Sequence, residues 1–307
     1  MLISRFACWV LLASLSCSAW AGADAALVAR QSAAIAAQPQ RIVSLDELTT
    51  ELLVSLGIEP VGVANLANYR RYIGIGDELL EHSVALGSAQ QPDLEAIARL
   101  KPDLVVGVAY LHLQLFERLD GLAPTLIYQV SLAAGGPDGV AIGEAMLLHL
   151  GQLTGRQAQA RQAVEEARAA LAAAQRTVRE GGLAGEPVAV LYPLVQQGTF
   201  IALNQQTLIG SLMARLGVHS PWPLHSAHSL HRRIDMRALA GEERLRVLFI
   251  GGQVEAPFFD SRLWRALPLA RRQHYGFLAT PYWTFGGPRS TAIIAAQIGD
   301  ALQAMNR

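Results

Sequence analysis

The chain has 307 residues, of which 51% are apolar and 16% are charged, and its 25 Lys and Arg balance its 25 Asp and Glu. This composition is too apolar for a disordered chain, and the length suffices for two packed lobes. The balanced charge argues against a nucleic-acid partner, because binding to phosphates is driven by clustered positive charge.

Residues 1–21 are predicted to be a cleaved secretory signal peptide. Arg5 precedes the apolar run FACWVLLASL, and small residues follow up to Ala21, where we expect cleavage. The run is about ten residues long, whereas roughly 20 are needed to cross a bilayer. Cys8 and Cys17 both lie in this segment, so the mature chain has no thiol for a disulfide, a nucleophile or a metal site. A lipoprotein anchored at Cys17 is the alternative, although SLSC lacks the Leu that normally precedes the lipidated Cys by three residues.

The rest of the chain repeats one plan twice. RIVSL and the helical pattern ELTTELLVSLGI open the first half, and PVAVLY and TLIGSLMARLGV open the second. The two helical patterns end at Gly57 and Gly217, where Gly favours a helix C-cap. DLEAIARLKPDLVVGV is then echoed by IDMRALAGEERLRVLFIGG. Strands that alternate with helices predict α/β architecture with a mainly parallel sheet in each half, that is, two Rossmann-like lobes at residues 40–137 and 185–307.

Between the halves, residues 138–180 are predicted to be helical, with a break at Gly155. The later part carries an apolar stripe on one face, formed by Ala160, Val164, Ala167, Leu171, Ala174 and Val178. We interpret the region as a long rigid interlobe helix that joins the two lobes. The alternative is a coiled-coil dimer face, but an Ala-rich seam buries little area, so we expect a monomer.

Two such lobes predict a cleft between them, lined by the loops that follow the strands. These loops are rich in aromatic and amide side chains, namely Tyr69, Tyr72, Tyr110, Trp222, Trp283, Phe285, Gln90, Gln91, Gln196 and Gln197. This composition suits a large, partly apolar ligand that is held without reacting.

Motifs for covalent chemistry are absent from the sequence. GIGDEL has Leu79 where a dinucleotide fingerprint needs its third Gly, and there is no Walker, GxSxG or HExxH pattern. A Ser, His and Asp set assembled in space stays open. HSAHSLHRR places His225, His228 and His231 at three-residue intervals without a carboxylate or thiolate partner in the run, so both a polar loop and a metal site stay open.

Several stretches together resemble the helix-spined substrate-binding proteins of bacterial ABC importers for ferric siderophores, cobalamin and haem. They are RIVSL, ELLVSLGIEPVGV, PDLEAIARLKPDLVV, LWRALPLARRQHY and FGGPRSTA, and the similarity extends from about residue 40 to residue 304. The resemblance implies a periplasmic carrier and not an enzyme, with no resident cofactor or catalytic residue, which delivers its ligand to an inner-membrane permease.

Within that family the chain is most similar to the ferric-hydroxamate siderophore-binding proteins, through NYRRYIG, an aromatic residue at position 110 and PYWTFGGPRSTA. This implies that Tyr72, Tyr110, Trp283 and Phe285 line the ligand cleft. The hydroxamate binders carry an Arg shortly before PDLE that contacts oxygens around the iron, whereas this chain has GSAQQ. We expect Gln90, Gln91, Arg70 and Arg71 to be the candidates that replace it.

The resemblance also implies docking to the permease through an acidic side chain on each lobe. In the first lobe Glu95 of PDLE matches this acidic position. In the second lobe the matching position holds Arg237, so we expect Asp235, Glu242 or Glu243 to take this role.

The resemblance places Trp222, His225, His228 and His231 on the cleft. There the imidazoles would hydrogen-bond to a chelate whose iron is already coordinated, or give a positive field, and would not ligate metal. Haem is the alternative ligand, with Tyr110 or a His as axial ligand. A siderophore-processing enzyme is the alternative from another class, and direct binding of zinc or iron by the His run is a third.

Overall fold

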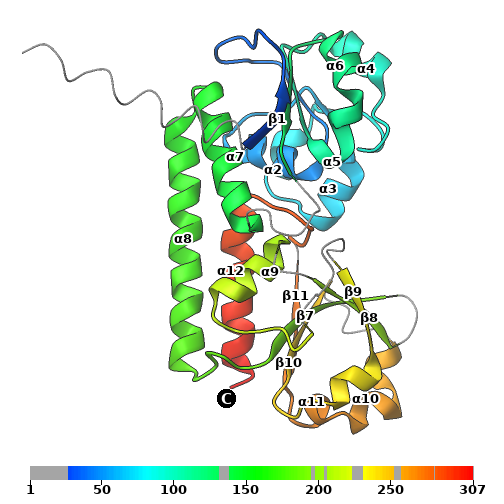
Figure 1. Cartoon of the computed structure of the whole chain (residues 1–307), viewed down its shortest axis with the longest axis vertical. Helices are drawn as coiled ribbons and strands as arrows, with labels where there is room; N and C mark the ends of the chain where they lie inside the picture. Colours follow the sequence, from blue (N-terminus) through cyan, green and yellow to red (C-terminus); the bar gives the residue numbers. More distant parts are fainter. Residues whose placement is uncertain are drawn as a thin grey trace, which may run out of the picture.

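The computed structural model describes residues 27–130, 138–194, 198–203, 206–222, 231–251, 257–279 and 281–306. It confirms the α/β prediction: each half of the chain builds its own sheet with helices packed on it (Figure 1). His225 and His228 lie outside the described residues, as do Gln196, Gln197 and the predicted signal peptide. None of the helices within these ranges is both long enough and apolar enough to cross a membrane.

The first sheet has six strands in the order β1-β6-β5-β2-β3-β4. They are β1 (Val28–Gln31), β2 (Ile42–Ser44), β3 (Gly62–Val63), β4 (Val84–Ala85), β5 (Leu104–Val108) and β6 (Thr125–Tyr128). All neighbours are parallel except β1, which runs antiparallel to β6. The lobe boundary predicted at residue 40 is therefore too late, because β1 already belongs to this sheet.

The helices of the first lobe follow its strands. They are α2 (Glu47–Ser55), α3 (Leu66–Tyr72), η1 (Asp77–Leu80), α4 (Leu94–Leu100), α5 (Ala109–His112), η2 (Leu113–Leu115) and α6 (Phe116–Asp120). Asp46 and Asp93 cap the starts of α2 and α4 by accepting a backbone N–H of the first turn. Helix α2 ends before Gly57, whose φ of 71° is the left-handed conformation predicted for a C-cap glycine.

The second sheet has five strands in the order β11-β10-β7-β8-β9. They are β7 (Val188–Pro193), β8 (Thr199–Leu203), β9 (His231–Asp235), β10 (Arg246–Ile250) and β11 (Tyr275–Leu278). β10 is parallel to β7 and β11, but β8 is antiparallel to β7 and β9. The prediction of a mainly parallel sheet is wrong for this half. Only five residues separate Pro193 from Thr199 in the sequence, whereas a connection between parallel strands needs about a dozen or more.

Helices cover both faces of the second sheet. They are α9 (Leu208–Arg215), η3 (Met236–Ala240), η4 (Pro257–Asp260), α10 (Arg262–Ala266), α11 (Pro268–Arg271) and α12 (Pro288–Ala304). One face packs against α8, α9 and α12, and the other packs against the aromatic core around Phe249, Phe259 and Trp264. α9 ends before Gly217 at φ 78°, as α2 ends before Gly57.

The region between the lobes consists of two helices, α7 (Gly139–Leu153) and α8 (Gln157–Glu180). They are separated at Gly155, whose φ is 72°, as predicted. Figure 1 shows α8 (green) running beside both lobes, with α12 (red) along its later part. The apolar stripe of α8 divides between two cores: Ala160 and Val164 pack in the first lobe, and Leu171 and Val178 pack in the second. The stripe is buried within the chain, so it is not the dimer face that the alternative reading required.

Candidate functional site

Aromatic side chains from both lobes meet where the chain passes from β11 to α12. The Tyr72 ring at the end of α3 stacks on Trp283 with 5.6 Å between centroids and lies 5.7 Å from Tyr282. Tyr192 at the end of β7 contacts Tyr282 edge-on at 5.6 Å. These four rings are half-buried, so each has one part in contact with its neighbours and another part accessible.

A second pair lies on the same segment. Tyr110 at the start of α5 is half-buried and stands 5.9 Å from Phe285, which is buried in the first-lobe core. The sequence predicted that Tyr72, Tyr110, Trp283 and Phe285 serve one site. The structure brings them together in two pairs, Tyr72 with Trp283 and Tyr110 with Phe285, which the short segment 283–285 connects.

Tyr192 and Tyr282 were not singled out from the sequence. The Tyr192 hydroxyl donates to the Tyr282 carbonyl oxygen at 3.0 Å. Burial raises the pKa of Tyr192, so it remains a neutral donor. A signal for Tyr192 was present, because it lies near the carboxyl end of a buried parallel strand, where ligand-binding residues of α/β sheets gather.

The two arginines of NYRRYIG have different surroundings. Arg70 donates to Asp77 at 2.7 Å and to the Leu80 carbonyl at 3.1 Å, which ties it to the first lobe. The Arg71 guanidinium lies 5.2 Å from the centroid of the Tyr72 ring. Arg71 forms no ion pair with any residue that the structure describes, so it is the cation of this pair that stays available at the aromatic cluster.

Two buried carboxyl groups lie at the carboxyl end of β2. Asp46 caps α2 by accepting from the Thr49 N–H at 2.9 Å, and Glu47 accepts from the Asn65 side chain at 2.9 Å. Burial, with Asp46 beside it, raises the pKa of Glu47 to about 7. Burial also raises the pKa of the Tyr110 hydroxyl, and the two carboxylates add to that effect.

Glu47 makes the stability of the fold depend on pH. Its pKa rises from 4.5 in a free side chain to about 7 in the folded chain. The folded chain therefore binds this proton more tightly than the unfolded chain does. The resulting stabilisation is complete below pH 4.5 and is lost as the pH rises through about 7. The shift corresponds to about 3 kcal/mol of differential stability. Glu47→Gln keeps the acceptor for Asn65 without a titrating proton, so urea unfolding should lose this pH dependence between about pH 4.5 and about pH 7.

Glu95→Gln is the matched control for that measurement, since Glu95 also stands in the first turn of a helix but is 91% exposed. Its pH profile of stability should follow that of the unsubstituted protein. A Glu47→Gln profile with an unchanged slope would contradict the assignment.

His112 fixes the loop that carries Gln90 and Gln91. Its Nδ1 accepts from the Val108 N–H at 3.0 Å, so its Nε2 carries the proton and donates to the Ala89 carbonyl at 2.9 Å. Burial lowers the pKa of His112, in agreement with this neutral form. Both glutamines are exposed beside this bond. His112 was not predicted, because a lone His in an apolar run has no partner visible in the sequence.

Three other predicted residues belong to a hydrophobic core or to a strand. Tyr69 is fully buried and donates to the Ile75 carbonyl at 2.6 Å, so it is a core residue. Trp222 packs against the aromatic core of the second lobe. His231 is the first residue of β9 and not part of a loop, and it pairs with Leu203, the last residue of β8. Across the described ranges no three His, Cys, Asp or Glu side chains are grouped to hold a metal ion.

The two carboxylates expected to face a transporter are both exposed. Glu95 lies in the first turn of α4, 3.9 Å from Arg99. Asp235 ends β9 and accepts from the Ala238 N–H at 3.1 Å, which caps η3. Each has a local structural role, and each leaves carboxylate oxygen accessible to a partner.

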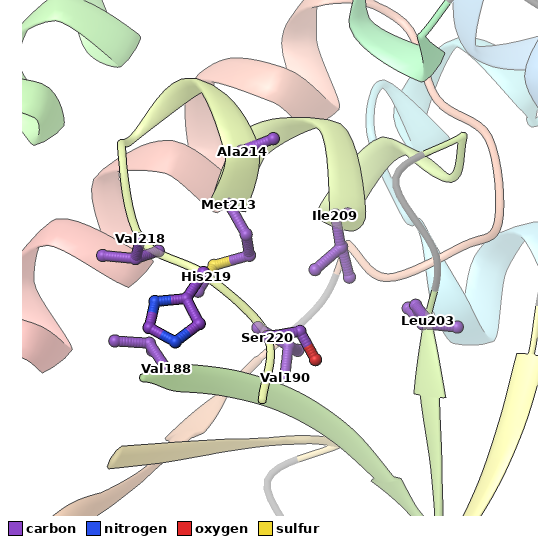
Figure 2. A pocket seen from close by; sticks show the side chains of 10 residues that line it. Val188, Val190, Leu203, Ile209, Met213, Ala214, Val218, His219 and Ser220 are labelled. Carbon is purple, nitrogen blue, oxygen red and sulfur yellow. The ribbon is translucent and has the colours of Figure 1, made fainter. Parts of the chain in front are cut away.

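A separate cavity lies between α9 and strands β7 and β8 (Figure 2). It has a volume of about 80 Å³ and is lined mainly by apolar side chains, with His219 and Ser220 at one side. Ligand sites for drug-sized molecules start at about 300 Å³. This cavity is therefore too small for the large ligand that the aromatic cluster suits.

Comparison with known proteins gives the same fold and one family. The family model described as periplasmic binding protein matches residues 42–270. The probable siderophore-binding lipoprotein YfiY of Bacillus subtilis is 33% identical over 108 residues, which are 35% of this chain and 33% of that protein. The Fe(3+) dicitrate-binding periplasmic protein FecB of Escherichia coli is 24% identical over 269 residues, 84% of this chain and 82% of that protein.

Among solved structures, the siderophore-binding protein FhuD of Vibrio cholerae with bound Fe3+-Desferal matches with a TM-score of 0.76. The match has 23% identity and covers 87% of this chain and 98% of that chain. At this identity the likeness shows the fold: two lobes in that structure correspond to the two lobes described above.

Proposed function

Because the chain belongs to the periplasmic binding protein family, we propose that it is the substrate-binding component of an ABC importer and carries a ferric siderophore. After removal of residues 1–21 it acts in the periplasm as a monomer. It returns its ligand unchanged, and it hands the ligand to an inner-membrane permease.

The aromatic cluster at the lobe junction is the observation that carries this proposal. Tyr72, Trp283, Tyr282 and Tyr192 are half-buried rings contributed by α3, β7 and the segment before α12. Such rings offer a large rigid apolar surface with hydroxyl groups at its edge, which suits an organic chelate that surrounds iron. The names of the relatives, a siderophore-binding lipoprotein and a ferric dicitrate-binding protein, support the same class of ligand.

Arg71 supplies the positive charge that the site needs for chelate oxygens. The Arg expected before PDLE is missing, and Arg70 is engaged with Asp77. Arg71 lies over the Tyr72 ring, where its guanidinium can donate to ligand oxygens without breaking an ion pair of the described chain. Gln90 and Gln91, on the loop that His112 holds, are the second group of donors.

Haem fits this site less well than a preformed chelate. A tyrosine that ligates haem iron does so through its hydroxyl oxygen, and burial beside Asp46 and Glu47 raises the pKa of Tyr110 and opposes its ionisation. This observation favours a ligand whose iron arrives fully coordinated.

Glu95 and Asp235 are our candidates for docking to the permease. They are exposed carboxylates, one on each lobe, as docking to arginines of a transporter requires. Neither forms a close ion pair in the described chain, since the distance from Glu95 to Arg99 is 3.9 Å.

Tryptophan fluorescence of the mature protein tests the proposed function. Titrations would use Fe3+-Desferal, Fe3+ dicitrate, ferric enterobactin, haem and Zn2+. Saturable quenching at submicromolar concentration by one ferric chelate is the expected result, and chromatography should recover that chelate unchanged. A tight response to haem or Zn2+ alone would contradict the proposal, and a chemically altered chelate would indicate an enzyme.

A further inference from the structure

A buried glutamate of the first lobe holds the start of the last helix. Glu51 on α2 has no exposed surface. Its Oε2 accepts from the Gly287 N–H at 3.0 Å and from the Ser290 hydroxyl at 2.7 Å, and its Oε1 accepts from the Ser290 N–H at 2.8 Å. These donors belong to the first turn of α12, whose later turns lie in the core of the second lobe.

Glu51 supplies the acceptors that the first turn of α12 lacks at its own N-cap. The N-cap residue of α12 is Gly287 and Pro288 follows, so no side chain at the N-cap position satisfies the free N–H groups. The helix dipole adds positive potential at the same place. All partners of Glu51 are donors, which fits an ionised carboxylate, although burial raises its pKa.

The glycines beside Glu51 leave the space that its carboxylate occupies. A Cβ at Gly287 would lie 2.9 Å from Glu51 Oε1 and 2.9 Å from a Leu52 methyl group. One residue earlier, the Gly286 carbonyl packs directly on Gly143 of α7. The GG of the FGGPRS sequence is therefore the space that allows α12 to approach α2 and α7 this closely.

The aromatic segment is held between this contact and a second one. Tyr282 N–H donates to the Tyr72 carbonyl at 3.0 Å, and Gly287 is bound by Glu51. Between them, the Thr284 carbonyl accepts from the Leu208 N–H at 2.9 Å. The rings of Tyr282, Trp283 and Phe285 thus lie on a short stretch of chain that is fixed at both ends.

We propose that Glu51 is a positioning residue, whose buried carboxylate caps α12 from the other lobe and thereby fixes the segment 282–287 that presents the aromatic side chains of the site. The consequence for ligand affinity rests on the proposed function. The effect on the position of Trp283 does not, because it is a property of the ligand-free protein.

Fluorine NMR of 5-fluorotryptophan-labelled mature protein tests this directly. The mature chain contains Trp222, Trp264 and Trp283, and Trp283→Phe assigns the third resonance. In Glu51→Gln an amide NH2 replaces one carboxylate oxygen and faces the N–H and O–H donors of Gly287 and Ser290. This loosens the segment 282–287, so the Trp283 resonance should shift or broaden. The resonances of Trp222 and Trp264, which pack in the second-lobe aromatic core, should stay in place. Affinity for the ferric chelate that binds the unsubstituted protein should fall about tenfold, as for loss of bonds to a buried charge.

Glu47→Gln is the matched control, because Glu47 is a second buried glutamate of α2 that bonds to Asn65 and not to α12. It should leave the Trp283 resonance unchanged. An unchanged Trp283 resonance in Glu51→Gln would overturn the proposal, and so would equal shifts of all three resonances, which indicate a general loss of structure. If Glu51→Gln does not fold, Ser290→Ala removes a single donor and decides the question by the same resonance.

The two proposals fail in different ways. If no ferric chelate binds the unsubstituted protein but Trp283 responds to Glu51→Gln, the proposed ligand is wrong and the positioning role stands. If a ferric chelate binds with equal affinity to both proteins and Trp283 does not respond, the ligand class stands and the positioning role is wrong.

Discussion

Trp283→Ala should weaken the binding of the ferric chelate by about 100-fold, corresponding to about 3 kcal/mol, as expected for an aromatic residue at the centre of a contact. Trp283 stacks on Tyr72 at 5.6 Å, so its removal takes away one ring and leaves Tyr72 without its stacking partner. Fluorescence reports on Trp283 itself, so affinity should be measured by isothermal titration calorimetry. The dissociation rate is expected to account for most of the loss.

Two comparison variants define the site around Trp283. Tyr72→Phe keeps the stacked ring and removes only a hydroxyl, so its affinity should fall far less than that of Trp283→Ala. Trp222→Ala removes a tryptophan that packs on the second-lobe aromatic core, and we expect its affinity to stay within about threefold of the original value. Strong loss in Trp222→Ala with little effect in Trp283→Ala would contradict the site described above and return the assignment to the second lobe.

Gly143→Ala should destabilise the fold by roughly 1–3 kcal/mol, the usual cost of overpacking a well-packed interior. Gly143 lies in α7, where Ala is otherwise the better helix former. Its Cβ would overlap the Gly286 carbonyl oxygen and lie 3.2 Å from the Gly287 Cα, and both are backbone atoms that cannot rotate away. Urea unfolding monitored by circular dichroism would measure the change in the free energy of unfolding.

Gly299→Ala is the matched control, since Gly299 is also a buried glycine inside a long helix. A Cβ there would meet Ala174 at 3.4 Å, an ordinary contact distance. The substitution should therefore be neutral or stabilise the protein by up to about 1 kcal/mol through helix propensity. Equal effects of the two substitutions would show that the crossing of α7 and the segment before α12 is looser than the structure indicates.

Local features of the chain were predictable because they depend on near neighbours in the sequence. Gly57 and Gly217 end their helices in the left-handed conformation, and Gly155 separates α7 from α8. The α/β class and the family membership are confirmed, the latter by the match over residues 42–270. The alternation of strands and helices, with its apolar runs, carries that information without reference to distant residues.

Features that depend on pairing between separate segments of the chain were not predicted or were predicted wrongly. The antiparallel pairing of β7 with β8 contradicts the expected parallel sheet, because the five residues between the two strands are too few for a parallel connection. β1 joins the first sheet by pairing with β6, a partner near the other end of that lobe's sequence. His231 belongs to a strand at the edge of the second sheet and not to a loop.

The sequence by itself determined which kinds of residue follow the strands: aromatic, amide and arginine side chains, with no thiol in the predicted mature chain. Only the tertiary structure decided which of them share a site. Tyr72, Tyr192 and Trp283 come from segments far apart in the chain, and they meet because α12 crosses back to α2. That crossing depends on a buried carboxylate and on glycines at contact distance, and such complementarity exists only once the elements are packed.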